Sequence, residues 1–228
     1  KRVDGFLYSD VEEPPTPGSI EANWVSARRL GLDVRSEEHV PLPFATHRDA
    51  IKFVGPVARI NPLAYCRGLA NFVSQSENVR IFERSRARDL PTSLAGTSNL
   101  LTEVDSFDES TGATVTRKVT SRKVVLATGT PFGSMLTLET RVRPFNSFVV
   151  AARLEHPLTD SLFWDTKTPY RYTRVIGAPL PDTILVGGED VPTGKGGKLQ
   201  VEALKNYVRK KFPIREFIGE WSSELYSS

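Results

Sequence analysis

Sulfur-containing residues are scarce in this chain, which has one cysteine, Cys66, and one methionine, Met135, in 228 residues. A single cysteine excludes an intrachain disulfide and is typical of proteins from reducing compartments. Cys66 lies beside Tyr65 in a stretch with helical spacing, so we expect a buried, inert thiol rather than a nucleophile. We therefore predict a cytoplasmic protein.

Side chains that commonly carry catalytic or metal-binding chemistry are also few. The three histidines, His39, His47 and His156, do not have the spacing of metal ligands, and no cysteine cluster accompanies them. No Gly-x-Ser-x-Gly motif marks a hydrolase nucleophile. The sequence therefore predicts no metal site, and it leaves the catalytic residues unknown.

The glycines after residue 187 do not form a phosphate-binding loop. Five residues separate Gly188 from Gly194, one more than such a loop has. Gly196 also stands where that loop places the Ser or Thr that holds magnesium. We interpret this segment as a flexible loop between a strand and a helix.

The chain has neither a strong charge bias nor a long apolar run. It carries 30 Lys and Arg residues against 27 Asp and Glu residues, a net charge of +3. The densest basic cluster, 208–212, falls at the end of an expected helix, where the helix dipole favours cations. No apolar run approaches the roughly 18 residues needed to span a bilayer. We expect neither nucleic-acid binding nor a membrane span.

Composition and length favour an ordinary globular fold with many turns. Hydrophobic residues make up 39% and charged residues 25% of the chain, and Gly and Pro number 16 each. This length fits one large or two small domains, and we predict a mixed α/β fold rather than a helical bundle. Because the first residue is Lys1, we expect a piece of a longer protein, so the missing leader is uninformative.

Helical periodicity marks three stretches. The first begins with Ser19 as N-cap and ends at Gly31 as C′ residue. The second has Asn61 as N-cap and Pro62 at the first helical position, and the third covers 198–212. The expected inward faces of the second and third helices are Leu63, Cys66, Leu69, Ala70 and Val73, and Leu199, Ala203, Leu204, Tyr207 and Val208.

Patterns typical of β-structure fill most of the remaining chain. A five-residue turn, Asp108 to Gly112, lies between two alternating runs and predicts a hairpin. The run 122–128 is continuously apolar near its end, which predicts a strand buried on both faces. The proline-containing stretch 35–44 is interpreted as a loop. Strands are predicted at 5–8, 79–82, 101–107, 113–119, 122–128, 147–152, 170–175, 183–187 and 217–221.

Three parts of the sequence form a collinear series. The first part is the second expected helix and the residues before it, 55–70. The second part is 79–87 together with 121–129, which follows the hairpin, and the third part is 170–174 together with 184–190. None of these motifs is specific alone, but their order and spacing over about 5–221 resemble the D-amino-acid oxidase superfamily of FAD enzymes, which includes glycine oxidase.

The resemblance implies a substrate domain joined to part of a cofactor domain. The fold would be mixed α/β (α+β), with a Rossmann-like FAD-binding part lacking its first βαβ unit and a mostly antiparallel substrate domain with helices. The substrate domain would cover 1–50 and 130–212, and the partial FAD domain 51–129 and 213–228. The Gly-x-Gly-x-x-Gly fingerprint that brings a dinucleotide to a helix N-terminus is missing here. The chain would therefore be an internal fragment that is inactive by itself and for which FAD binding is doubtful.

The resemblance also implies substrate-binding residues on one strand. Arg174 stands where the family often has a cation facing the flavin, and a guanidinium pairs bidentately with a carboxylate. Tyr172 and Tyr170 share its strand face and could bind the substrate, or could simply pack. Glu189 and Asp190 follow a strand, either as solvated loop residues or as a rim for a cationic amine.

Cofactor-binding residues are implied at three further positions. Ala87 matches the position whose backbone meets the adenine in the family. Thr128 and Gly129 end the apolar strand 122–128 at its carboxyl edge, where α/β proteins bind ligands. Gly129 would allow close approach of the cofactor, or would be a plain turn glycine.

The function implied by the resemblance is oxidation of the C–N bond of an amine or amino acid, with hydride transfer to FAD and an imine product. The flavin would carry the chemistry, so a catalytic histidine is not required. A non-catalytic binding module derived from the substrate domain is the alternative, and an unrelated α+β protein is a third hypothesis. Exposed strand edges would also favour self-association.

Overall fold

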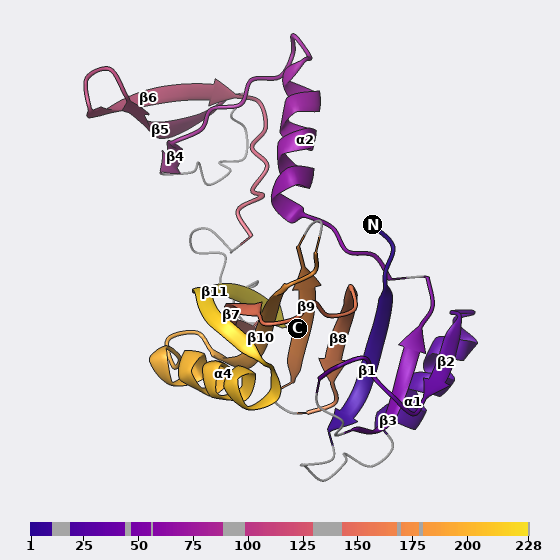
Figure 1. Cartoon of the computed structure of the whole chain (residues 1–228). Helices are drawn as coiled ribbons and strands as arrows, with labels where there is room; N and C mark the ends of the chain where they lie inside the picture. The colour runs from indigo at the N-terminus through magenta and orange to yellow at the C-terminus, as the bar shows by residue number, and fades with distance from the viewer. Residues whose placement is uncertain are drawn as a thin grey trace. The chain divides into compact units, whose positions relative to one another are not determined.

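The computed structural model describes residues 1–10, 19–43, 47–55, 57–88, 99–129, 143–167, 170–177 and 180–227. The chain divides into two compact units (Figure 1). The larger unit comprises Lys1–Ile60 with Val142–Ser228, and the smaller unit comprises Asn61–Arg141. The predicted mixed α/β fold class is confirmed, because helices accompany one mixed and one antiparallel sheet.

The larger unit is built on an eight-stranded sheet in the order β11-β7-β10-β9-β8-β1-β3-β2. Neighbouring strands are antiparallel except β1 and β8, which are parallel. The strands are β1 Asp4–Asp10, β2 Val34–Glu37, β3 His47–Phe53, β7 Arg143–Leu154, β8 Ser161–Asp165, β9 Arg171–Ile176, β10 Thr183–Pro192 and β11 Ile214–Ser227.

Helix α4, Lys198–Lys211, covers one face of this sheet at β7, β10 and β11 (Figure 1). Its buried residues include Leu204 and Val208, which join the main hydrophobic core. Leu199 was expected on the same face but is 82% exposed. Leu204 lies five positions further along the chain, a rotation of about 140° around the helix, so Leu199 points away from the core. Strand residues of this core include Phe6, Tyr8, Phe148, Val150, Ala152, Leu154, Phe163, Val175, Ile184 and Val186.

Helix α1, Ser19–Arg29, covers the opposite face at the β1–β3 end of the sheet. Leu7 alternates with Phe6 and Tyr8 along β1 and belongs to a second core cluster with residues of α1, β2 and β3. The predicted helix end is confirmed. Gly31 has φ +73°, and the Leu32 amide donates to the Ala27 carbonyl in a Schellman arrangement.

The smaller unit contains helix α2, Pro62–Ser74, and a three-stranded antiparallel sheet. The predicted cap is confirmed, because the Ala64 amide donates to Asn61 Oδ1 at 3.1 Å with Pro62 in the first turn. The sheet has the order β4-β5-β6, from β4 Ser85–Arg88, β5 Leu100–Asp108 and β6 Ala113–Ser121. The predicted hairpin is therefore present, and its turn is closed by Ser110 donating from its amide to Asp108 Oδ1.

Several local predictions are wrong. The runs 79–82 and 122–128 are not strands, because the described residues offer them no neighbouring strand to pair with. Cys66 is exposed rather than buried, since no residue of α2 is buried. The stretch 35–44, expected as a loop, contributes to β2, and β3 was not expected.

The compact units differ from the predicted domain bounds at two places. Residues 51–60 and β11 belong to the larger unit, where β11 pairs with β7 over nearly its whole length. The assignment of one part to substrate and another to cofactor stays a prediction.

Candidate functional site

Strand β9 presents the predicted substrate-binding residues on the sheet face opposite α4. Thr173 and Val175 are buried, and Val175 belongs to the core that α4 covers. Side chains alternate along a strand, so Tyr172 and Arg174 lie on the other face. We call this surface, formed by Tyr170, Tyr172 and Arg174 with Gly187 and Asp190 of β10, the open face.

Tyr172 lies flat against the neighbouring strand at a glycine. Gly187 pairs with Tyr172 across β9 and β10, and a Cβ added to Gly187 would stand 2.2 Å from the Tyr172 hydroxyl oxygen. Burial raises the pKa of Tyr172, although its hydrogen bond with Ser147 acts in the opposite direction. The absence of a side chain at Gly187 therefore allows the phenol ring of Tyr172 to pack directly on the backbone of β10.

The guanidinium group of Arg174 uses one of its nitrogens in a hydrogen bond and has a second nitrogen that lacks an acceptor among the described residues. Its Nη2 donates to the carbonyl of Ile60, while its Nε is buried with no partner among the described residues. Burial lowers the pKa of Arg174, and the neighbouring Arg59 lowers it further. Arg59 is engaged elsewhere, with Asp160 Oδ1 at 2.6 Å and the Val175 carbonyl at 2.6 Å. A buried guanidinium nitrogen without an acceptor favours an anionic ligand.

Tyr170 and Asp190 form the other end of the open face. The rings of Tyr170 and Tyr172 lie 6.2 Å apart between centroids and are tilted by 35°. Tyr170 hydrogen-bonds Asp190, and its pKa is raised by burial and by the Asp190 charge. Oδ1 of Asp190 is buried and has no partner among the described residues.

A bulge in β10 determines which face of the sheet each of two consecutive acids occupies. The register shifts between Gly188 and Val191, and Glu189 adopts φ +55°, which is uncommon for a residue with a side chain. Glu189 Oε1 accepts from Arg171 Nε at 2.9 Å and from Nη2 at 2.5 Å on the α4 side. The guanidinium of Arg171 lies over the ring of Tyr207 at 4.6 Å.

This geometry corrects the sequence interpretation of both acids. Glu189 and Asp190 lie within β10 and not in a loop after it. Glu189 has a structural ion pair away from the open face, whereas Asp190 lies beside the two tyrosines. Gly188 permits the bulge, because its φ is +136° and an added Cβ would stand 2.2 Å from the Tyr170 carbonyl oxygen.

The predicted cofactor-binding residues all belong to the smaller unit. Ala87 lies on the edge strand β4, exposed, and pairs with Val104 of β5. Thr128 and Gly129 are exposed and follow the irregular segment 122–127. Gly129 has φ +73°, and no atom of the described residues lies within 4 Å of the position of an added Cβ.

Among the described residues, Gly129 leaves open space where a bound group could approach the backbone. However, no glycine-rich turn leads from a strand into a helix N-terminus within the described part of the smaller unit, so a diphosphate cradle is not formed there.

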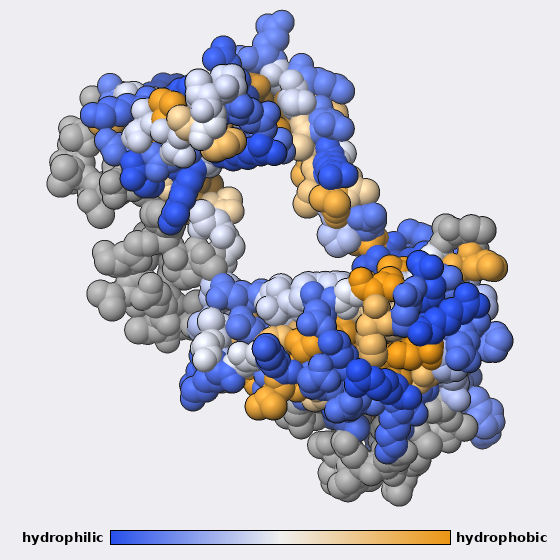
Figure 2. All heavy atoms as spheres, turned by 60° about the vertical axis from the view of Figure 1, so that its left-hand side comes forward, coloured by the Kyte–Doolittle hydropathy of each residue, from blue (hydrophilic) through white to orange (hydrophobic). Residues whose placement is uncertain are grey.

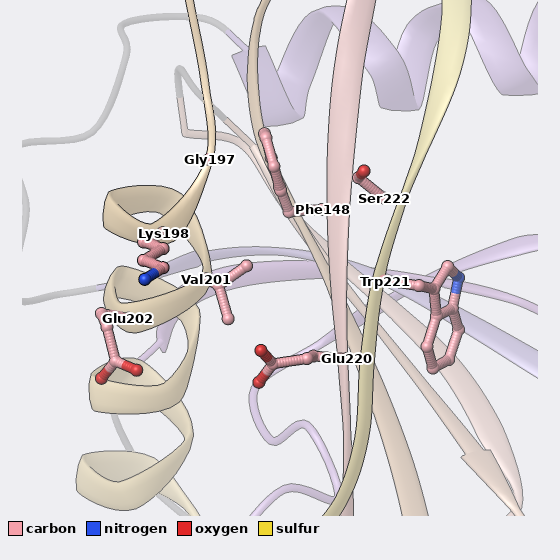
Figure 3. Close-up of a pocket in the computed structure, with 8 residues that line it drawn as sticks. All are labelled: Phe148, Gly197, Lys198, Val201, Glu202, Glu220, Trp221 and Ser222. Carbon is pink, nitrogen blue, oxygen red and sulfur yellow. The ribbon is translucent and has the colours of Figure 1, made fainter.

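Away from the open face, a groove of about 450 Å³ lies between α4 and β11 (Figure 3). Figure 3 shows Glu220 on the α4 side of β11 and Trp221 pointing away from α4. Lys205 bridges Glu220 at 2.5 Å and Glu202 at 3.4 Å, so these carboxylates are already paired. The groove therefore combines surface ion pairs with the apolar side chains of Phe148 and Val201.

Some contributors to the open face were not found from the sequence. Gly187 and Ser147 carry no chemical signal, although a glycine pair inside a β-branched strand indicates a close approach or a bulge. The Arg59–Asp160 pair joins residues 101 positions apart, which no local pattern reveals. Outside the open face, the buried Asp165, whose pKa burial raises to about 6, was also missed.

Two further sequence predictions concern metals and membranes. The part of the chain that the structure describes contains no group of three or more His, Cys, Asp or Glu side chains suited to a metal ion. In the same part, none of the helices has the length and apolar character needed to cross a bilayer.

The fold is similar to that of solved flavoenzymes. Glycine oxidase from Bacillus cereus superposes with a TM-score of 0.65 at 16% identity, covering 97% of this chain and 61% of that one. L-proline dehydrogenase from P. horikoshii gives 0.66 at 11% identity, covering 98% and 60%. NikD, an amino acid oxidase of nikkomycin biosynthesis, gives 0.64 at 14% identity, covering 99% and 61%.

This chain thus spans about 60% of the length of the structures it matches. No curated protein sequence matches it. The family model described as "DAO: FAD dependent oxidoreductase" matches residues 6–226. The collinear segments, the fold and this match agree, and the chain belongs to the DAO family of FAD-dependent oxidoreductases.

Proposed function

We propose that the protein to which this chain belongs oxidises the C–N bond of an amine or amino acid, with Arg174, Tyr172 and Tyr170 binding the substrate. The observation that carries the proposal is the unpartnered, buried Nε of Arg174 on the open face. A carboxylate would supply the missing acceptor, and the two tyrosine rings would border the remainder of the substrate.

Under this proposal the larger unit supplies the substrate-binding surface. Ala87, Thr128 and Gly129 of the smaller unit would contribute part of the FAD site. FAD, when bound, would accept a hydride from the carbon next to the nitrogen and leave an imine. The chain's own residues would orient the amine and exclude water from it, so the catalytic step needs no histidine.

The solved relatives support the substrate class as an analogy. They are a glycine oxidase, an L-proline dehydrogenase and an amino acid oxidase, each named for an amino acid. The single cysteine supports a reducing, cytoplasmic location. Apolar side chains exposed on the smaller unit support self-association of this chain when it is isolated.

A flavin-binding experiment separates the enzyme from the alternative, a non-catalytic binding module. FAD would be titrated into this chain and into the full-length protein, with visible absorbance and flavin fluorescence as readouts. We expect the full-length protein to be yellow and this chain to bind FAD weakly or not at all. A colourless full-length protein that still binds amines would establish the binding module instead.

The role of Arg174 is tested on the flavin-loaded protein by bleaching with a panel of amines and amino acids. Arg174→Met is expected to raise KM for carboxylate-bearing substrates by about 10- to 100-fold, the effect of a lost charge-assisted hydrogen bond. The matched control, Arg153→Met, removes an exposed arginine of β7 and should leave KM unchanged. Equal KM values for both variants would refute substrate binding by Arg174.

A further inference from the structure

Asp190 combines three properties that a purely structural carboxylate does not need. It lies on the open face beside Tyr170 and Tyr172, and it is hydrogen-bonded by the first of these. Its Oδ1 is buried without a partner among the described residues. A buried, unpaired carboxylate oxygen is costly, so a donor or a cation brought by a ligand would stabilise it.

The two tyrosines beside Asp190 provide a second element of cation recognition. Their ring centroids are 6.2 Å apart and the rings are inclined at 35°, so a ligand placed over both rings would occupy one volume beside Asp190. The face of an aromatic ring attracts a cation within about 6 Å of its centroid. Aromatic faces together with a carboxylate are the combination that recognises ammonium and methylated ammonium groups.

The backbone directs Asp190 towards this volume. The bulge between Gly188 and Val191 places Glu189 on the α4 side, where Arg171 holds it with two hydrogen bonds. Glu189 keeps a left-handed backbone conformation that is unfavourable for a residue with a side chain. Because the Glu189–Arg171 ion pair holds Glu189 on the α4 side, the next side chain, Asp190, is directed to the open face.

We propose that Asp190, with the rings of Tyr170 and Tyr172, forms a subsite for a cationic nitrogen of the substrate, as an ammonium or methylated ammonium group. The proposal rests on the proposed function, because it takes the open face as the substrate-binding face. It adds a second pole to that face: Arg174 takes an anionic group, and Asp190 takes a cationic one. Neutral or purely anionic molecules of the same shape would bind less well.

The test compares two probes of equal shape on the full-length, flavin-loaded protein. Choline carries a trimethylammonium group, and 3,3-dimethylbutan-1-ol carries an uncharged tert-butyl group in its place. Isothermal calorimetry is expected to give a dissociation constant at least about 10-fold lower for choline, the ratio expected from one cation–π contact and one ion pair. Equal affinities for the two probes would overturn the proposal.

Three variants connect the preference to the subsite. Asp190→Asn should bring the two probes to within about 2-fold of each other, whereas Glu216→Gln, a matched loss of charge at an exposed position of β11, should keep the preference. Tyr172→Leu should reduce it several-fold, which keeps the test decisive should Asp190→Asn fail to fold. A choline preference that survives both Asp190→Asn and Tyr172→Leu would refute the subsite.

The proposed function and the subsite can fail separately. Should the protein oxidise no amine and yet show an Asp190-dependent preference for choline, the subsite stands and the oxidoreductase proposal falls. Should amines bleach the flavin while both probes bind alike, the oxidoreductase proposal stands and the subsite falls.

Discussion

The two units of this chain use similar apolar content very differently. The larger unit has two hydrophobic clusters, one on each face of its sheet. In the described part of the smaller unit Thr102 is the single buried residue, and no hydrophobic side chain is buried. The difference shows that one unit is stabilised by its own packing, whereas the other depends on hydrogen bonding within its helix and hairpin.

The apolar residues of the smaller unit have regular spacing but nothing packed on them. Figure 2 shows hydrophobic, orange spheres at the surface of this unit among hydrophilic ones. Such a surface indicates an interaction face or a tendency to associate. The exposed large hydrophobic residues of α2, β5, β6 and the irregular segment include Leu63, Leu69, Phe72, Leu101, Phe107, Val119 and Val125.

The largest expected effect is the loss of a core side chain from the larger unit. Leu204 is 0% exposed, so Leu204→Ala should lower the free energy of unfolding by about 2–5 kcal/mol. Leu69→Ala on α2, where the leucine is 51% exposed, should change it by less than about 0.5 kcal/mol. Urea denaturation followed by circular dichroism measures both, with Leu199→Ala as the exposed control on α4. Equal losses for Leu204 and Leu69 would contradict the comparison.

Hydrogen exchange should separate the two units directly. Amides of β7 and β10, two interior strands of the larger sheet, should exchange at least about 100-fold more slowly than those of β5 and β6, because local opening of a unit without a core costs little. Mass spectrometry of peptic fragments over a time course gives the rates. Comparable protection in both units would show that the smaller unit is stabilised by contacts of its own.

A buried carboxylate should give the larger unit a distinctive pH dependence. Burial raises the pKa of Asp165 from 3.8 to about 6, against hydrogen bonds from the Arg171 and Lys167 amides, and Oδ2 has no partner among the described residues. Between these two pH values the folded state binds the extra proton. Stability should therefore fall by about 2 kcal/mol as pH rises from 4 to 6, and change no further above that from this group.

The substitution Asp165→Asn isolates this contribution. Because asparagine does not titrate, the variant should gain about 2 kcal/mol of unfolding free energy relative to the parent as the pH rises from 4 to 7. Urea titrations of both proteins at the two pH values measure it. A difference that does not depend on pH would show that Asp165 titrates alike in the folded and unfolded states.

The smallest expected effect lies in the turn of the smaller unit. Hydrogen bonds from the side chain and the amide of Ser110 lower the pKa of the exposed Asp108, the opposite direction to Asp165. Any stability it contributes is thus present at neutral pH and is lost as pH falls through its lowered pKa. Asp108→Ala should speed exchange of the Ser110 amide, measured by NMR, while the urea midpoint stays constant. Unchanged exchange would mean that the turn holds without this carboxylate.

Features that depend on neighbouring residues could be predicted from the sequence. The Asn61 cap with Pro62, the Gly31 helix end and the Asp108–Gly112 turn each use contacts within five residues, and all three are present. The runs 79–82 and 122–128 were mispredicted, since a strand is defined by a partner that no local pattern supplies.

In the candidate site too, features set by local sequence were predictable, whereas features set by strand pairing were not. The shared face of Tyr172 and Arg174 follows from strand alternation and is present on β9. The face taken by each of Glu189 and Asp190 was not predictable, because it depends on a bulge that arises in the pairing of β10 with β7 and β9. Substrate and cofactor roles remain predictions until binding is measured.

The bulge in β10 also makes the chemistry of the open face sensitive to chain length. Side-chain direction along a strand has a period of two, so every residue beyond the bulge has its orientation set by one inserted position. Deleting either residue between Gly188 and Val191 would remove one of the two carboxylates and leave the other on the open face, because regular alternation would return. A relative with one residue fewer there would keep an acid on the open face and would lose the carboxylate that pairs with Arg171, although its alignment showed only a gap.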